Sequence, residues 1–207
     1  SGWTIEYRPS ARVLHKHRNR IWPFCKRRFQ YGTSEPLLQS LHPERGKSFE
    51  VWPKALIFWM LFVGTVVSGS WMVGVGTGAW ILADTLLRYR RISRAVTYIN
   101  PLLALGAVLR SNLSFLFHCC SFMSRYYLIL ATALLPLFPM IGCLSWFLHL
   151  GVGIVEFRVR KPRLNVLAFL ALFSIEQLSY QTGVWFGCFK TRFFLPVFPR
   201  FSIKAIE

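Results

Sequence analysis

The chain has 207 residues, of which 54% are hydrophobic, and a formal net charge of +17 at pH 7. A soluble chain this basic is normally poorer in apolar residues, as nucleic-acid-binding domains and disordered tails are. The alternation of apolar runs with Lys and Arg clusters is typical of a membrane protein with basic cytoplasmic edges. The apolar segments, and the lack of a recognisable nucleic-acid-binding motif, argue against nucleic acid as a partner.

The first region, residues 1–50, begins with two short β-type runs at residues 3–7 and 11–15. The chain opens on Ser1 and not on Met, and its first seven residues already read as a strand, so we expect it to be a fragment of a longer protein. A basic stretch follows, and then a helix is expected at residues 35–41. Ser34 would be its N-cap, because a serine hydroxyl can accept from the free N–H groups of a first turn.

The second region, residues 51–207, is expected to associate with a membrane. Residues 55–83 carry no charge and are too long for a single upright span of about 30 Å. Ser68, Gly69 and Ser70 lie near the centre of this segment. Two alternatives therefore remain: one tilted span, or two short helices in a hairpin.

Three further segments of this region contain long apolar stretches. Residues 95–123 include Arg110, and an arginine in mid-membrane is costly, so we expect an interfacial segment or two short helices broken near Arg110. Residues 126–150 are the strongest candidate for a span, with a kink at Pro136 and Pro139. Residues 164–189 are too short to cross twice and are expected to lie in the interface as an amphipathic element.

Four basic clusters separate these segments and should all prefer the cytoplasmic side, which favours hairpins and interfacial helices over single crossings. They are residues 8–28, 88–94, 158–163 and 190–204.

Candidate binding residues lie in the first region. His15 ends the second β-type run and could ligate a divalent metal or donate to a diphosphate, although a histidine in a loop is common. The guanidinium groups of Arg27 and Arg28 suit phosphate, Tyr31 could stack on a sugar or base, and Gly32 would let the backbone approach a ligand. The alternative is a basic interfacial helix that binds anionic headgroups.

The acidic residues provide little catalytic chemistry. Glu176 is expected to pair with an arginine or a hydroxyl group, because buried charges are usually paired. Asp84 is the single aspartate of the sequence, so the chain cannot supply a paired-aspartate metal site by itself. The five scattered cysteines include no CxxC pair, which argues against a disulfide framework or a zinc site.

A family resemblance rests on three blocks of sequence. Residues 2–15, GWTIEYRPSARVLH, resemble the last catalytic-domain strands of family 2 glycosyltransferases of the GT-A fold, and the basic segment up to Gly32 fits the same family. Residues 28–43 and 176–188, which include RFQYGTSEPL and EQLSYQTGVWFGC, are similar to the mycofactocin-system glycosyltransferases. Those enzymes attach glucose to a peptide-derived redox cofactor.

This resemblance implies an inverting enzyme that transfers a hexose from a nucleotide sugar, with UDP-glucose as the expected donor, to a peptide-derived or lipid-linked acceptor. His15 would help an acidic motif outside this chain to hold Mg²⁺ or Mn²⁺, and Arg27 and Arg28 would contact diphosphate or acceptor, beside Tyr31 and Gly32. No catalytic residue is expected within the fragment. The resemblance places the enzyme on a bacterial cytoplasmic membrane, with membrane lipids as partners and the catalytic part on the cytoplasmic side.

The predicted fold is therefore mainly α and membrane-associated. Residues 1–50 would be the C-terminal edge of a GT-A-like catalytic domain, a short α/β remnant, and residues 51–207 would form several transmembrane or interfacial helices. Two alternative functions remain. One is a family 2 glycosyltransferase of lipid-linked or envelope polysaccharide synthesis, and the other is a non-enzymatic basic membrane anchor or scaffold.

Overall fold

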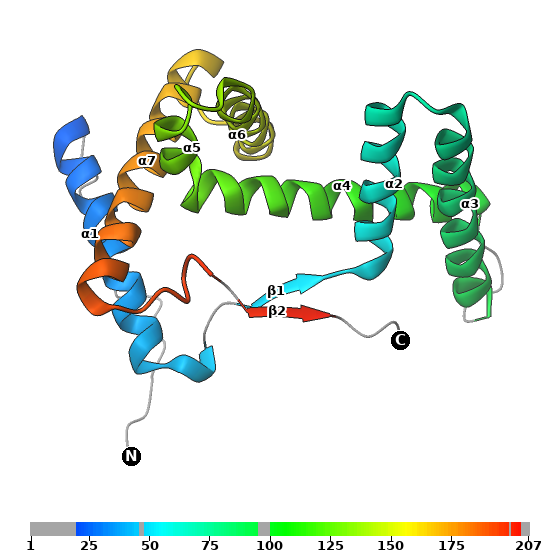
Figure 1. Cartoon of the computed structure of the whole chain (residues 1–207), viewed down its shortest axis with the longest axis horizontal. Helices are drawn as coiled ribbons and strands as arrows, with labels where there is room; N and C mark the ends of the chain where they lie inside the picture. Colours follow the sequence, from blue (N-terminus) through cyan, green and yellow to red (C-terminus); the bar gives the residue numbers. More distant parts are fainter. Residues whose placement is uncertain (1–19, 46–47, 95–99, 199, 204–207) are drawn as a thin grey trace, which may run out of the picture.

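The computed structural model describes residues 20–45, 48–94, 100–198 and 200–203, and this part of the chain is mostly helical, as predicted (Figure 1). The two β-type runs predicted at residues 3–7 and 11–15 lie outside the described residues. The elements follow in the order α1 (Ile21–Leu41), η1 (Pro43–Arg45), β1 (Ser48–Val51), α2 (Pro53–Ser68), α3 (Trp71–Ser93), α4 (Pro101–Tyr126), α5 (Leu128–Ala133), α6 (Pro139–Arg160), α7 (Val166–Thr191) and β2 (Arg200–Ile203).

Helix α1 is longer than the sequence predicted. The expected start at Ser34 is wrong, because the helix begins at Ile21 and the Ser34 hydroxyl donates to the carbonyl of Tyr31 inside the helix, at 3.0 Å. The buried face of α1 consists of Gly32, Glu35, Pro36 and Gln39. Such a small and polar face carries no hydrophobic periodicity, so the sequence pattern did not reveal the helix.

Helices α1 and α7 pack backbone to backbone, and Figure 1 shows them side by side. A methyl group added at Gly32 would lie 2.1 Å from the carbonyl oxygen of Tyr180, and one added at Gly183 would lie 2.1 Å from that of Phe29. Gly187 similarly faces the carbonyl of Thr33 at 2.6 Å. Glycine at these positions therefore sets the close approach of the two helices.

Residues 55–83 form a hairpin of two helices, so the second of the two sequence alternatives is confirmed. Gly69 closes the turn in the left-handed conformation, with φ 61°, which glycine adopts without a Cβ clash. The hydroxyls of Thr65 and Thr77 lie 3.1 Å apart between α2 and α3. At the other end of the hairpin, Lys54 of α2 is ion-paired with Asp84 of α3 at 2.7 Å.

Two helix predictions need correction. Helix α4 runs unbroken through Arg110, which is exposed, so the predicted break at this residue is wrong. The predicted span at residues 126–150 is interrupted rather than kinked. Helix α5 ends at Ala133, and α6 begins at Pro139, which lacks the N–H that a helix interior would require.

Helix α4 joins the two ends of the molecule. In Figure 1 it runs from the α1–α7 pair across the α2–α3 hairpin. Near its end, the fully buried His149 of α6 shares hydrogen bonds with Ser124 of α4 at 2.6 Å and with Ser174 of α7 at 2.9 Å. One imidazole therefore connects three helices.

A short parallel pair of strands joins distant parts of the sequence. Residues Ser48 to Val51 of β1 are in register with Arg200 to Ile203 of β2. The ring of Phe49 contacts Phe115 and Phe122 of α4 in edge-to-face geometry, with centroids 6.3 and 5.9 Å apart. The strands thus lie against α4, below it in Figure 1.

Two helices of the described chain, α4 and α6, are long and apolar enough to cross a membrane by length and composition. Helix α7 does not meet that criterion. It is largely occupied by its contact with α1, and its predicted interfacial position is not tested by the structure.

Candidate functional site

The basic face of α1 carries the predicted phosphate-binding residues, but the fold brings them into internal contacts. The guanidinium group of Arg27 lies over the ring of Tyr31, one helical turn away, at 4.7 Å from the ring centroid. Arg28 is ion-paired with Glu176 of α7. The predicted pairing of Glu176 with an arginine is thereby confirmed, and Arg28 has a partner that a diphosphate would have to displace or share.

Gly32 lies in the α1–α7 interface. The close backbone approach that this glycine permits is to Tyr180 and Val184 of α7. Arg27, Arg28 and Tyr31 are brought together along α1, with Gly32 buried beneath them. His15 lies outside the described residues.

The described residues do not fit a divalent metal by themselves. Within residues 20–45, 48–94, 100–198 and 200–203, no group of three or more His, Cys, Asp or Glu side chains is arranged to hold an ion. Asp84 is buried and ion-paired with both Lys54 and Arg88, at 2.7 and 3.2 Å. Metal ligands would have to come from outside the described residues.

A buried carboxylate between α1, α4 and α7 was missed by sequence reasoning. Glu35 accepts hydrogen bonds from the hydroxyls of Tyr126, at 3.1 Å, and Tyr180, and from the amide of Gln39 at 3.3 Å. The guanidinium group of Arg125 lies over the Tyr180 ring, 4.1 Å from its centroid. The available signal was the spacing of Gly32, Glu35 and Gln39, which places all three on one helical face.

The surroundings of this cluster raise the pKa of Tyr180, its phenol on α7. Desolvation raises the pKa of Tyr180 to about 12, and the negative charge of Glu35 adds to the increase. Tyr180 therefore stays protonated and donates to Glu35 throughout the neutral range. The cluster is a polar contact that joins α1 and α4 to α7.

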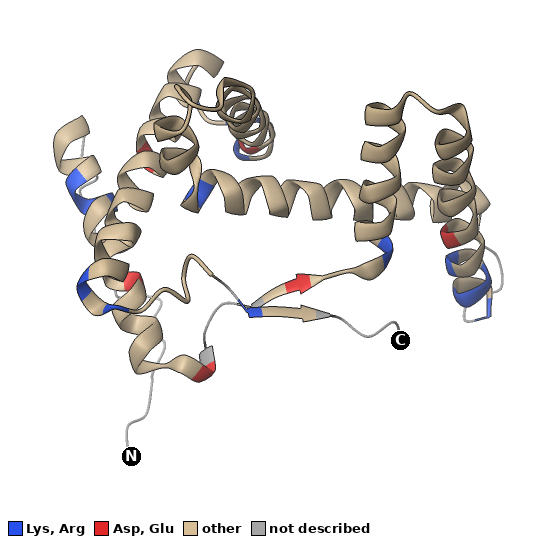
Figure 2. Ribbon diagram, viewed as in Figure 1, with Lys and Arg blue, Asp and Glu red and all other residues tan. Residues whose placement is uncertain are grey.

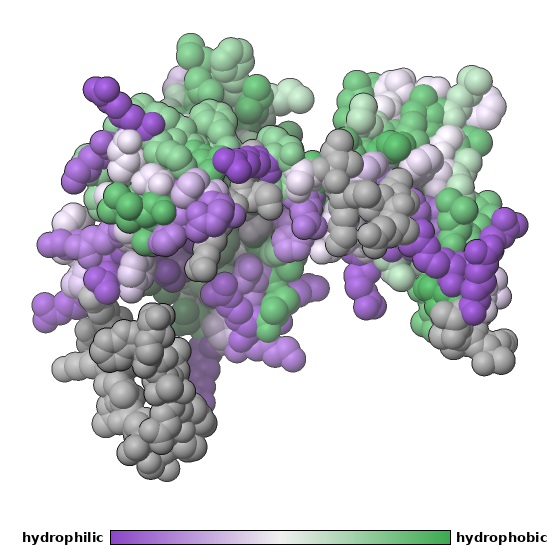
Figure 3. All heavy atoms as spheres, turned by 90° about the horizontal axis from the view of Figure 1, so that it is seen from below, coloured by the Kyte–Doolittle hydropathy of each residue, from purple (hydrophilic) through white to green (hydrophobic). Residues whose placement is uncertain are grey.

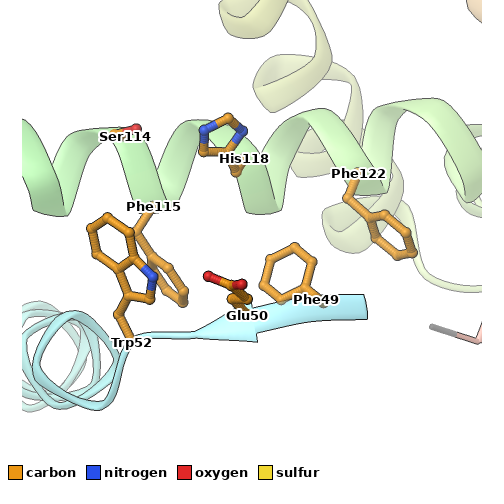
Figure 4. A pocket seen from close by; sticks show the side chains of 7 residues that line it. All are labelled: Phe49, Glu50, Trp52, Ser114, Phe115, His118 and Phe122. Carbon is orange, nitrogen blue, oxygen red and sulfur yellow. The ribbon is translucent and has the colours of Figure 1, made fainter. Parts of the chain in front are cut away.

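A groove of about 430 Å³ lies between β1 and α4 (Figure 4). Its lining combines four aromatic rings with a carboxylate, an imidazole and a hydroxyl group. These residues are Phe49, Glu50, Trp52, Ser114, Phe115, His118 and Phe122. In Figure 4, Glu50 points from β1 toward α4, with Trp52 and Phe115 on one side of it and Phe49 on the other. Flat apolar rings beside a hydrogen-bonding acid suit a ligand with both apolar faces and hydroxyl groups.

Comparison with known proteins supports a relationship to glycosyltransferases. The chain is 27% identical to the "Pre-mycofactocin glycosyltransferase" of Mycobacterium tuberculosis, in strains CDC 1551 / Oshkosh and ATCC 25618 / H37Rv alike. The aligned 206 residues cover 93% of this chain, which spans 41% of the length of these relatives. No family model matches the chain, and no solved structure matches it significantly.

Proposed function

We propose that this chain is the membrane-associated C-terminal part of a glycosyltransferase that, in its whole form, transfers a hexose from a nucleotide sugar to an acceptor. The observation that carries this proposal is the similarity to the mycobacterial enzyme along 93% of the chain. A similarity of that extent includes the helices as well as the short motifs. Family 2 membership and an inverting reaction follow from the resemblance of residues 2–15. UDP-glucose as donor follows from the resemblance of residues 28–43 and 176–188, and all of these are part of the proposal.

The acceptor that we propose is pre-mycofactocin, after which the mycobacterial relative is named, or another peptide-derived molecule of the kind that the sequence resemblance implies. A lipid-linked or envelope polysaccharide acceptor is the alternative. The groove of Figure 4 supports a saccharide or glycosylated acceptor, because its aromatic rings can cover the apolar face of a sugar while polar side chains of its lining bond to hydroxyl groups.

The site residues on α1 have a specific role in this proposal. Arg27 is exposed on the helix surface and Arg28 is partly exposed, with 34% of its side chain accessible. Both can therefore reach an anion brought against α1, and their planar donors suit a diphosphate. Negative charge that develops on the departing diphosphate would be stabilised by these two groups. Holding Mg²⁺ or Mn²⁺ through His15 remains a part of the proposal that depends on residues outside the described chain.

The test uses the whole protein, including the region upstream of Ser1, assayed for transfer from and hydrolysis of UDP-glucose. Arg28→Ala and Glu176→Ala break the same ion pair, so they are matched variants. If Arg28 contacts the diphosphate, Arg28→Ala raises the donor KM about tenfold or more, whereas Glu176→Ala, which frees Arg28, does not.

An equal change in the donor KM for the two variants would show that Arg28 has a structural role and does not contact the diphosphate. Failure of the intact protein to turn over any nucleotide sugar would instead favour the non-enzymatic membrane anchor.

A further inference from the structure

The α2–α3 hairpin has an uncharged tip that projects from the rest of the molecule. Figure 2 shows no charged residue on its upper part, and charged residues gather at its lower end. Large apolar side chains at the tip are open to the surroundings, with Val67 81%, Trp71 76% and Met72 66% exposed. In Figure 3, which views the molecule from below, the lobe that contains the hairpin shows hydrophobic side chains together with hydrophilic ones.

The exposed apolar residues are present on both helices and are not confined to one stripe. Met60 and Val66 of α2, which lie on different sides of the helix, are 66% and 68% exposed, and Val75 of α3 is 62% exposed. A helix that docks on a protein groove would present one apolar face and keep the other polar. A surface that is apolar in several directions suits a fluid apolar surrounding, which is the acyl region of a bilayer.

The lower end of the hairpin has the opposite character. Asp84 is neutralised by Lys54 and Arg88, and the last turn of α3 carries Arg90 and Arg91, both exposed. Exposed arginines beside an apolar insertion attract anionic lipid headgroups. The charge pattern therefore assigns the tip to the membrane interior and the lower end to its surface.

The length of the hairpin decides how far it can reach. At 1.5 Å per residue, the uncharged parts of α2 and α3 each measure about 20 Å, whereas the hydrocarbon core is about 30 Å thick. The tip can reach about the middle of the bilayer but cannot reach the far headgroups. The turn contains Ser68, Gly69 and Ser70, whose polar groups are partly satisfied locally, since Ser68 donates to the Gly64 carbonyl and accepts from the Ser70 N–H.

Helix α4 marks the level of the membrane surface. It contacts the hairpin below its tip, where Trp59 donates to the carbonyl of Asn112 at 3.1 Å and Arg88 reaches the hydroxyl of Ser111 at 3.5 Å. Because α4 runs across the hairpin in Figure 1, the two cannot both follow the bilayer normal. With the hairpin inserted, α4 lies in the interface and Arg110 stays out of the hydrocarbon core.

We propose that the α2–α3 hairpin is a re-entrant membrane finger: residues 60–82 insert among the acyl chains on one side of the bilayer, and the arginines that end α3 bind anionic headgroups on the same side. This deepens the membrane association within the proposed function and names its lipid partner. It does not depend on the sugar chemistry, because its test measures depth in lipid and not turnover.

The test measures the depth of two tryptophans of the same hairpin. The chain is reconstituted in vesicles of phosphatidylcholine and phosphatidylglycerol whose acyl chains carry bromine at a shallow or a deep position. The fluorescence of Trp71 is the difference between the wild type and Trp71→Phe, and that of Trp52, at the start of α2, is obtained from Trp52→Phe. We expect deep bromines to quench Trp71 more strongly, and shallow bromines to quench Trp52 more strongly.

Equal depth for the two tryptophans would mean that the hairpin lies flat, and shallow quenching of Trp71 alone would mean that the tip reaches a headgroup region. An unquenched Trp71 would mean that the tip contacts water or a protein. Each of these results overturns the proposal.

A second measurement uses charge. Val67→Glu should lower the partition coefficient of the chain into these vesicles about tenfold or more, because a carboxylate would enter the hydrocarbon region. Val159→Glu, at a site 74% exposed near the basic end of α6, is the matched control, with an expected loss under about threefold. Equal losses for the two variants would contradict insertion of the tip.

Discussion

At the scale of single residues, the α1–α7 contact depends on glycines whose structural role is not evident from the sequence. Gly32 and Gly183 each face a backbone carbonyl of the other helix, so no side chain can be added without separating the helices. Gly106 of α4, in contrast, has open space where a Cβ would stand. The same residue type therefore has opposite roles in two helices.

Substitution by alanine should separate these roles. We expect Gly32→Ala and Gly183→Ala to lower the free energy of unfolding by about 1–3 kcal/mol each, because the new methyl group meets backbone that cannot move away. Gly106→Ala should raise it by up to about 1 kcal/mol, because alanine restricts the unfolded chain and favours the helix. Unfolding in detergent, followed by circular dichroism, gives all three values. If all three variants changed the free energy of unfolding in the same direction, the result would contradict the close packing of α1 on α7.

The partly buried phenol of Tyr180 leads to a prediction of how stability changes at alkaline pH. An unfolded tyrosine ionises near pH 10, whereas burial and the charge of Glu35 raise the pKa of Tyr180 to about 12. Between these values the folded chain binds more protons than the unfolded chain, so the Tyr180 contribution is complete below pH 10 and is lost as the pH rises toward 12.

Ultraviolet titration of the wild type against Tyr180→Phe should show one phenol titrating near pH 12. Glu35→Gln should lower that midpoint, because it removes a negative charge beside the phenol. A Tyr180 midpoint near 10 in the wild type would show that the phenol is not buried against Glu35.

At the scale of helices, the sequence predicted some features well and others not at all. The absence of charge over residues 55–83 indicated a membrane-associated segment. A tilted span and a hairpin would both lack charge there, so the sequence could not distinguish them. The left-handed conformation of Gly69 and the ion pair between Lys54 and Asp84 distinguish them. The start of α1 was missed because Ser34 resembles a cap, while its hydroxyl in fact bonds within the helix.

The candidate site was predictable to a similar degree. The pairing of Glu176 with an arginine could be expected, since a charge in an apolar segment needs a partner. Glu35 was not recognised, because a glutamate beside a proline resembles a first turn. The groove between β1 and α4 could not be predicted, because Trp52 and His118 are brought together only by tertiary packing.

The groove offers a prediction at this scale. Trp52→Ala in the whole enzyme should raise the acceptor KM about tenfold, because the loss of an aromatic face weakens acceptor binding, while the donor KM stays within about twofold. Phe201→Ala, on β2 outside the groove lining but in contact with Phe49, is the control for a general disturbance of the strands. Equal changes in both KM values would argue against an acceptor in this groove.

At the scale of the whole molecule, the helices point in different directions. Figure 1 shows α4 running across the hairpin and α6 seen nearly end-on, so α4, α6 and the hairpin cannot all cross one bilayer. Length and composition alone select α4 and α6 as candidate spans. The arrangement of the elements therefore limits what hydropathy suggests, and it agrees with the hairpins and interfacial helices that the basic clusters favour.

The position of α4 can be tested through Arg110. In an interfacial α4, Arg110→Leu should change the vesicle partition coefficient by less than about threefold, because the guanidinium group already lies among headgroups and water. In a spanning α4 the same change would remove a charge from mid-membrane and increase insertion by about a hundredfold. Flotation of the two proteins with vesicles distinguishes these outcomes.

The parallel pairing of β1 with β2 has a consequence for the order of assembly during synthesis. Strand β1 leaves the ribosome before the helices α2 to α7, and its partner β2 leaves after them. Parallel pairs between such distant segments form slowly, because the intervening chain must first be ordered. The strand pair can therefore form only after α2 to α7 have been synthesised, so it closes this part of the fold late.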